Sequence, residues 1–297
     1  MARWLNGLCF LALGFGCVAR GPSEAADPLL RTLDTTDHTI ERGRDADAFD
    51  EALDIYASLA AEAPDDLRVA ERLTRALYLR GYAFPERMPS PETFYESARA
   101  TGWRCLSAGT GLVLGSVARG SKLETAGYER LDKSRSGCMV YTTLAWARWI
   151  ALRGSQAMAL DLEPLKALAT GTLEVAELRE AGKASHAYAL VLALDAANGG
   201  TPWDEAEEAF QKAISHSPED FSRVVDWVEW VMIPTGRQHD ARKVLREIAD
   251  AQPVARANAE QAGTPSDVRA FERAAALLVG LSTKSLTASE ADRLDQE

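Results

Sequence analysis

The stretch WDEAEEAFQKAISHSPED (residues 203–220) and the stretch RQHDARKVLREIADAQP (residues 237–253) carry the same pattern of apolar residues thirty-five positions apart. The matching pairs are Ala206 and Ala241, Phe210 and Leu245, Ala213 and Ile248, and Pro218 and Pro253. Within each stretch the apolar residues recur at intervals of four and three, which places them on one face of an α-helix. The two stretches therefore predict two helices that bury the same kind of face.

A third copy of the pattern lies near the N-terminus, at Ala52, Tyr56, Leu59 and Pro64. This order of small and large apolar residues, with a period near 34, is typical of the second helix of a tetratricopeptide-type repeat. One such helical hairpin cannot bury its apolar face alone and must stack on its neighbours. We therefore predict an all-α, tetratricopeptide-like solenoid of about ten or eleven helices over residues 29–281.

The same periodicity sets the expected boundaries of the helices. We expect helices near 47–63, 67–82, 93–107, 138–153, 162–180, 184–197, 203–217, 219–233, 238–251 and 266–281. Pro202, Pro218, Pro234 and Pro253 are expected at helix boundaries, where proline is tolerated. Residues 108–135 are rich in glycine and predict a long loop or an irregular insertion, with a short helix near 123–132. Residues 282–297 form a polar tail.

Composition and charge exclude one class of partner. The chain has 297 residues, of which 46% are hydrophobic and 26% charged, as is usual for a folded soluble domain. Its formal net charge is −11, and no basic face is evident. Because binding to a phosphate backbone needs such a face, we expect no nucleic-acid partner.

The N-terminus has the features of an export signal. Residues 1–16 contain one basic residue, Arg3, and an apolar run that ends at Gly16, which is too short for a lasting membrane span. The stretch Leu13-Gly14-Phe15-Gly16-Cys17 resembles a bacterial lipobox, and it implies cleavage before Cys17 and acylation of its thiol. Ordinary cleavage or a retained anchor are the alternatives. Residues 17–28 would then be the lipidated cysteine and a flexible tether.

Export would place the remaining cysteines in an oxidising compartment, where thiols pair. Cys105 and Cys138 either form a disulfide or stay as two buried thiols, which behave as small apolar residues. The sequence does not decide between these alternatives.

The sequence carries no complete motif for a catalytic site or a metal site. The segment 115–122 resembles a phosphate-binding loop, but Ser121 stands before Lys122, in the reverse of the required order. None of the four histidines lies in a zinc-binding pattern. We therefore expect a protein that is not an enzyme and that holds no cofactor.

Aromatic residues cluster on two of the expected helices. Tyr141, Trp146 and Trp149 lie on one, and Trp227 and Trp230 on another. They would line a channel for an apolar or amphipathic ligand, or else pack between stacked helices as core.

Four stretches resemble the T-component family of TRAP transporters: RALYLRGYAF (75–84), YTTLAWARWIAL (141–152), HAYALVLAL (186–194) and GGTPWDEAEEAFQKAISHSPED (199–220). The family consists of exported lipoproteins with a helical repeat fold, and the resemblance covers most of residues 47–280. It implies an accessory role beside a periplasmic solute-binding protein, with a pore or cleft for a hydrophobic ligand. By this resemblance the pore is expected at Trp146, Trp149, His186 and Tyr188. The insertion at 108–122 and the two cysteines are departures from the family pattern.

These observations predict a lipid-anchored protein of the bacterial cell envelope that faces the periplasm, with the outer membrane as the expected site. The expected function is that of an accessory component of a TRAP-type uptake system, which binds a solute-binding partner and an apolar small molecule. The alternative is a repeat scaffold for outer-membrane or secretion assembly that binds peptides in its groove. Membrane contact is expected through the lipid anchor alone, and a homo-oligomer is compatible with the sequence. A hydrolase is disfavoured, because no activated nucleophile is visible.

Overall fold

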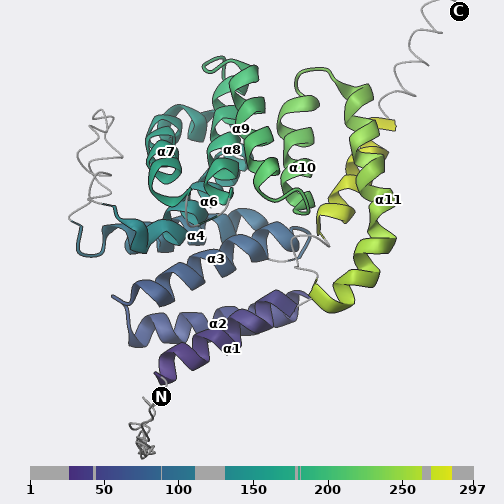
Figure 1. Cartoon of the computed structure of the whole chain (residues 1–297). Helices are drawn as coiled ribbons and strands as arrows, with labels where there is room; N and C mark the ends of the chain where they lie inside the picture. The colour runs from purple at the N-terminus through teal and green to yellow at the C-terminus, as the bar shows by residue number, and fades with distance from the viewer. Residues whose placement is uncertain are drawn as a thin grey trace, which may run out of the picture.

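The structure is a computed structural model, and it describes residues 27–42, 45–87, 89–110, 131–177, 180, 182–262 and 269–282. All regular secondary structure in these ranges is helical (Figure 1). The elements are α1 (Pro28–Arg42), α2 (Ala46–Glu62), α3 (Leu67–Ala83), α4 (Pro91–Ser107), η2 (Lys133–Arg135), α6 (Ser136–Arg153), α7 (Ser155–Ala176), α8 (Lys183–Ala197), α9 (Trp203–His216), α10 (Phe221–Trp227), η3 (Val228–Met232), α11 (Gln238–Ala262) and a last helix at 269–282. The prediction of an all-α fold built from packed helical hairpins is confirmed.

The helices stack in chain order. Each of the helices from α1 to α4 packs on the next, α4 packs on α6, and the series continues from α6 through α9. Contacts also join α3 to α6 and α6 to α8, so each layer rests on the layers beside it. Figure 1 shows α1, α2 and α3 at the N-terminal end, α4 and α6 in the middle, and α10 and α11 at the C-terminal end. Contacts between near neighbours are typical of a solenoid.

The repeat pattern marks the buried faces of its helices. Five of its members in α9 and α11 are fully buried, and a sixth is 3% exposed: Ala206, Phe210, Ala213, Ala241, Leu245 and Ile248. In α2, Ala52 and Tyr56 are fully buried as well, whereas Leu59 is only partly buried. The small alanines let neighbouring helices approach, while the large residues fill the space between them, each contributing about 1.5–3 kcal/mol.

Short polar residues define where several helices begin. The side chains of Asp45, Asp66 and Asp220 accept hydrogen bonds from backbone N–H groups in the first turns of α2, α3 and α10. Gly154 separates α6 from α7 with a φ of 76°, a conformation that favours glycine. These caps explain why consecutive helices can follow after only a few residues.

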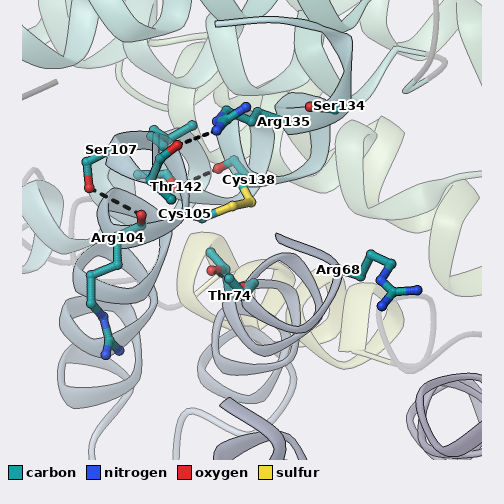
Figure 2. The surroundings of a disulfide bond; sticks show 12 residues. Arg68, Thr74, Arg104, Cys105, Ser107, Ser134, Arg135, Cys138 and Thr142 are labelled. Carbon is teal, nitrogen blue, oxygen red and sulfur yellow. Dashed lines mark hydrogen bonds between the residues drawn. A yellow bond between two sulfur atoms is a disulfide. The ribbon is translucent and has the colours of Figure 1, made fainter. Parts of the chain in front are cut away.

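The centre of the fold is α6, in which every residue from Ser136 to Ile150 is buried. It lies close to α4, because a Cβ atom on Gly102 would come within 1.8 Å of Thr142 Oγ1. A disulfide between Cys105 and Cys138 joins the same two helices, with 6.3 Å between the Cα atoms (Figure 2). Arg135 donates a hydrogen bond to the carbonyl of Ala108 nearby. The structure therefore pairs the two cysteines for which the sequence left both alternatives open.

Some expected boundaries are wrong. The apolar pattern of the sequence predicts no helix at α1, where Pro28 occupies the first turn and Leu33, Thr36 and Ile40 are buried. Helix α7 begins at Ser155, seven residues before the expected start, with Pro164 inside it. Helix α11 continues through Pro253 to Ala262, because good helix formers on both sides offset the one hydrogen bond that proline removes.

Several predictions fall outside the described residues. They are the signal peptide at 1–16, the lipidated Cys17, the tether as far as residue 26, most of the glycine-rich insertion at 108–135 with the phosphate-loop-like segment 115–122, and the tail after Ser282. Among the described helices, none has both the length and the apolarity that crossing a bilayer requires.

Candidate functional site

The most unusual feature of the interior is a set of charged and aromatic side chains contributed by distant parts of the chain. Tyr78 and Tyr82 come from α3, Arg148 from α6, His186 from α8, Asp226 from α10 and Trp230 from η3. We call this set the Arg148–Asp226 cluster. Three of its members, Arg148, His186 and Asp226, are polar residues with exposed fractions of 4%, 6% and 0%.

Asp226 is the centre of the cluster. Its Oδ2 atom lies 2.5 Å from Arg148 Nη2 and 2.9 Å from His186 Nε2. Its Oδ1 atom is buried and has no hydrogen-bond partner among the described residues. Leaving a charged acceptor buried and unpaired is costly, so buried polar atoms of this kind call for an explanation.

Aromatic rings enclose the guanidinium of Arg148. Its Cζ atom lies 4.6 Å from the ring centroid of Tyr82 and 5.8 Å from that of Trp230. Its Nε donates to the Tyr78 hydroxyl at 3.3 Å, and the Tyr78 and Tyr82 rings are stacked at 6.0 Å. Cation–π contacts of this type are strongest when the cation is shielded from water. The rings therefore hold Arg148 in one orientation, facing Asp226.

Burial and pairing act in opposite directions on the titration of these groups. Burial by itself would raise the pKa of Asp226, but the charge of Arg148 and the hydrogen bond from His186 outweigh it and hold that pKa well below its ordinary value. Burial raises the pKa values of Tyr78 and Tyr82, so both stay neutral hydroxyls. Arg148 and Asp226 therefore form a permanent buried ion pair at neutral pH.

The cluster reaches solvent on the side of η3. Glu229 and Trp230 are partly exposed, and Glu229 Oε2 accepts a hydrogen bond from Arg273 Nε at 2.7 Å. Arg273 belongs to the helix at 269–282, whose Arg269 also pairs with Glu86 at 2.7 Å, before α4. The C-terminal helix thus contacts both η3 and the turn between α3 and α4, beside the partly exposed edge of the cluster.

The helix that carries Asp226, Glu229 and Trp230 changes its winding at this place. It is α-helical to Trp227 and π-helical over Val228–Met232. Short π-helical turns often occur at functional sites, because the wider turn changes the direction of the side chains that follow. Here the change separates Asp226, which is buried, from Trp230, which contacts both Arg148 and solvent.

The four residues predicted as a pore do not form one group. Trp146 is 2% exposed and packs edge-on against Trp103, while Trp149 lies under Arg99 at 4.0 Å and beside Arg153. Tyr188 is half-buried against the core. Only His186 belongs to the Arg148–Asp226 cluster. None of the four lines either of two cavities, one beside α3 and one between α9 and α11.

Sequence reasoning missed most members of the cluster. Arg148 stands between Trp146 and Trp149 in a helix without an evident polar face, so its charge is a signal that could have been noticed. Asp226 occupies a helix position flanked by Val225 and Trp227, another such signal. The sequence around each residue does not indicate its partner, because the two lie 78 positions apart in the chain.

The side chains of the cluster are of the kinds that bind a ligand or a protein partner. It combines a fixed cation, a fixed anion, neutral hydroxyls and aromatic faces, which suit a ligand or partner with both polar and apolar parts. His186 makes its hydrogen bond to Asp226, and no serine, threonine or cysteine donates to it among the described residues. Among all the residues that the structure describes, no group of three or more histidine, cysteine or acidic side chains is placed to hold a metal ion.

Comparison with known proteins adds no relative. No protein-family model matches the chain, and no curated protein matches it.

Proposed function

We propose that this chain is a lipid-anchored, tetratricopeptide-like protein of the bacterial envelope that acts as an accessory component of a TRAP-type solute uptake system. In this role it binds a solute-binding partner, and its cluster of aromatic residues accepts an apolar ligand. The proposal rests on the lipobox-like N-terminus, on the resemblance of four stretches to the T-component family and on the helical-hairpin fold.

One observation carries the proposal furthest. Three of the stretches on which the resemblance rests meet in the Arg148–Asp226 cluster. The stretch 75–84 contributes Tyr78 and Tyr82, the stretch 141–152 contributes Arg148, and the stretch 186–194 contributes His186. Segments that are far apart in the sequence and that share both the resemblance and one contact network support a common role at one site.

The cluster has a buried part and a partly exposed edge, an arrangement that suits the binding of a partner. The buried ion pair gives a rigid base, because Arg148 and Asp226 hold one another in fixed geometry inside a packed core. Trp230 and Glu229 form the part that a partner reaches, and large partly exposed aromatics are enriched among the residues that dominate binding energies. Trp230 is the partly exposed member of the cluster, and we expect it to carry more binding energy than Glu229 beside it.

The experiment compares two tryptophan variants. Envelope extracts of the native host are treated with a short crosslinker, and proteins joined to this chain are identified by mass spectrometry, together with small molecules that co-purify. We expect a solute-binding protein and an apolar ligand with the wild type, and at least a tenfold loss of the protein crosslink with Trp230→Ala, since 1.4 kcal/mol corresponds to tenfold. Trp203→Ala is the matched control, because Trp203 is also partly buried against the core but lies outside the cluster.

Two results would count against the proposal. If wild type yields neither a solute-binding protein nor an apolar ligand, the transport role fails. If the crosslinked proteins belong instead to outer-membrane assembly or secretion, the scaffold alternative takes its place. An equal loss of the crosslink with Trp203→Ala would show that the effect of Trp230→Ala reflects folding rather than contact.

A further inference from the structure

An open groove of about 590 Å³ lies between α9, the end of α10 with η3, and α11, on a different set of residues from the Arg148–Asp226 cluster. Its apolar wall includes Trp227, Met232 and Val244, and its polar wall includes Glu207 and Arg237. We call it the α9–α11 groove. Its volume lies within the range of small-ligand sites, which combine apolar walls with a few polar groups.

Two hydrogen-bond donors among the lining residues have no acceptor in the described part of the chain. They are the indole Nε1 of Trp227 and the Nη2 of Arg237, both buried. The other nitrogens of Arg237 are occupied, since Nη1 donates to Glu207 Oε1 at 2.8 Å and Nε donates to Thr235 Oγ1 at 3.2 Å. The Arg237 guanidinium also lies 6.0 Å from the ring centroid of Trp227, so the two donors are on neighbouring side chains.

These unpaired donors indicate which chemical group a ligand of the groove must supply. A buried N–H group without an acceptor is unfavourable, and an oxygen that accepts from it removes that cost. The exposed fraction of the Arg237 side chain is 34%, so this side chain has room to move toward a bound acceptor. The missing group is therefore an oxygen acceptor rather than a further donor.

The charges around the groove favour a neutral acceptor over an anion. The lining residues include three carboxylates and two cations, and Arg237 is already paired with Glu207. The remaining charges are those of Asp240, Glu247 and Lys243, so an incoming anion would meet a net negative environment. A carbonyl oxygen accepts the same hydrogen bonds without this repulsion.

We propose that the α9–α11 groove binds a neutral carbonyl compound with an apolar substituent, of the amide type found in a peptide unit. The carbonyl oxygen accepts hydrogen bonds from Trp227 Nε1 and Arg237 Nη2. The apolar substituent packs against Met232 and Val244. This assignment does not depend on the proposed transport role, because it uses another surface and another set of contacts.

The indole N–H of Trp227 gives a direct measurement. The sequence contains seven tryptophans, of which Trp4 lies in the expected signal peptide, so ¹⁵N-labelled protein beginning at residue 18 should show six indole N–H signals. Trp227→Phe identifies the one that belongs to Trp227. Titration with N-acetyl-leucine methylamide should shift this signal in a saturable manner. The signals of Trp146 and Trp149 should stay in place, because neither residue lines the groove. Isovalerate, which has a similar apolar group but carries a carboxylate, should bind at least tenfold more weakly.

Arg237→Gln should weaken binding of the methylamide about tenfold, which is the effect of losing one charge-assisted hydrogen bond. Arg246→Gln is the matched control, since Arg246 is exposed on α11 and does not line the groove. Unchanged Trp146 and Trp149 signals in both variants would show that the fold is intact. A Trp227 signal that does not respond to the amide, or one that responds equally to isovalerate, would overturn the proposal.

A second titration distinguishes the source of the carbonyl. A blocked pentapeptide of alternating serine and leucine is compared with the single-residue amide. Similar affinities would assign the groove to a small ligand, and affinity at least tenfold higher for the pentapeptide would assign it to a polypeptide segment. Binding of neither probe would refute the proposal, whatever the outcome of the crosslinking experiment.

Discussion

Arginine–carboxylate pairs occur in two contrasting environments in this molecule. In the Arg148–Asp226 cluster the pair is buried, with side-chain exposed fractions of 5% and 0%. Between α1 and α3, arginines 68, 72 and 75 pair with Asp27, Asp37 and Glu41, and the exposed fractions of these side chains range from 20% to 51%. We call this second set the α1–α3 ladder. The chemical groups are the same, but water surrounds only one set.

This difference in solvation assigns different roles to the two sets. Exposed ion pairs are worth little, because water competes for each charge and salt screens their attraction. A buried pair contributes little net stability either, since the cost of removing two charges from water offsets their attraction, but breaking it leaves a bare charge in the core. The ladder therefore contributes little to holding α1 against α3. In the cluster, by contrast, loss of either Arg148 or Asp226 should lower the stability of the whole fold.

The largest effect is expected from breaking the buried pair. Asp226→Ala leaves Arg148 without its carboxylate inside the core and should lower the free energy of unfolding by about 3–5 kcal/mol. Urea denaturation followed by circular dichroism measures this change. A loss below about 1 kcal/mol would mean that water reaches Arg148 and that the cluster is not buried.

Replacing both charges should restore much of that loss. The double variant Arg148→Met with Asp226→Leu fills similar volume without leaving a charge, and we expect it to be more stable than Asp226→Ala by about 2 kcal/mol or more. The same denaturation experiment on the single variants Arg148→Met and Asp226→Leu completes a double-mutant cycle and gives the coupling energy. Additive losses would show that the two residues act independently, which contradicts the 2.5 Å contact between them.

Lowering the pH should reduce the contribution of Asp226 to the free energy of unfolding. Its pKa in the folded protein lies below its ordinary value of 3.8, so the stabilisation is complete above that pH and declines as the pH falls toward the folded-state pKa. The difference in unfolding free energy between wild type and Asp226→Asn should shrink by up to about 1.4 kcal/mol for each pH unit below about 4. Denaturation series from about pH 6 to pH 3 test this. A difference that grows on acidification would contradict the assigned direction.

The smallest effect is expected in the α1–α3 ladder. Arg72→Ala removes the 2.7 Å contact with Asp37 and should cost about 0.5–1 kcal/mol at low salt. At about 1 M salt, where the Debye length is near 3 Å, the difference from wild type should nearly vanish. Thermal denaturation at the two salt concentrations measures both values. A salt-independent loss of 3 kcal/mol would place the ladder in the same class as the buried pair.

The sequence predicted the features that depend on local residues and missed those that depend on contacts between distant parts of the chain. The repeat pattern in α2, α9 and α11 identified the buried face correctly, with Leu59 as the one apolar position that is only partly buried, because helical periodicity is a local property of the chain. Helix α1 was missed, since its buried residues are few and include Thr36. The π-helical winding of η3 and the continuation of α11 through Pro253 depend on context beyond local propensity, so single-residue preferences did not indicate them.

The site was less accessible to sequence reasoning than the fold. The family resemblance indicated a pore at Trp146 and Trp149, but both pack as core, which is the other alternative that the sequence left open for the aromatic residues. Arg148 between them carries the contact that organises the cluster. His186 was chosen through the family resemblance and does lie in the cluster. Asp226 could not be paired with Arg148 in advance, because the partner of a buried charge is set by how the helices stack and not by either local sequence.

In the proposed function, the buried charges of the Arg148–Asp226 cluster serve binding rather than stability. One measurement decides this: whether the Arg148→Met, Asp226→Leu double variant recovers the proposed solute-binding partner and apolar ligand, by crosslinking and mass spectrometry alongside its thermal stability. We expect a folded protein with a melting temperature close to that of wild type and at least a tenfold loss of both the partner and the ligand. A folded double variant that recovers them at the wild-type level would contradict it.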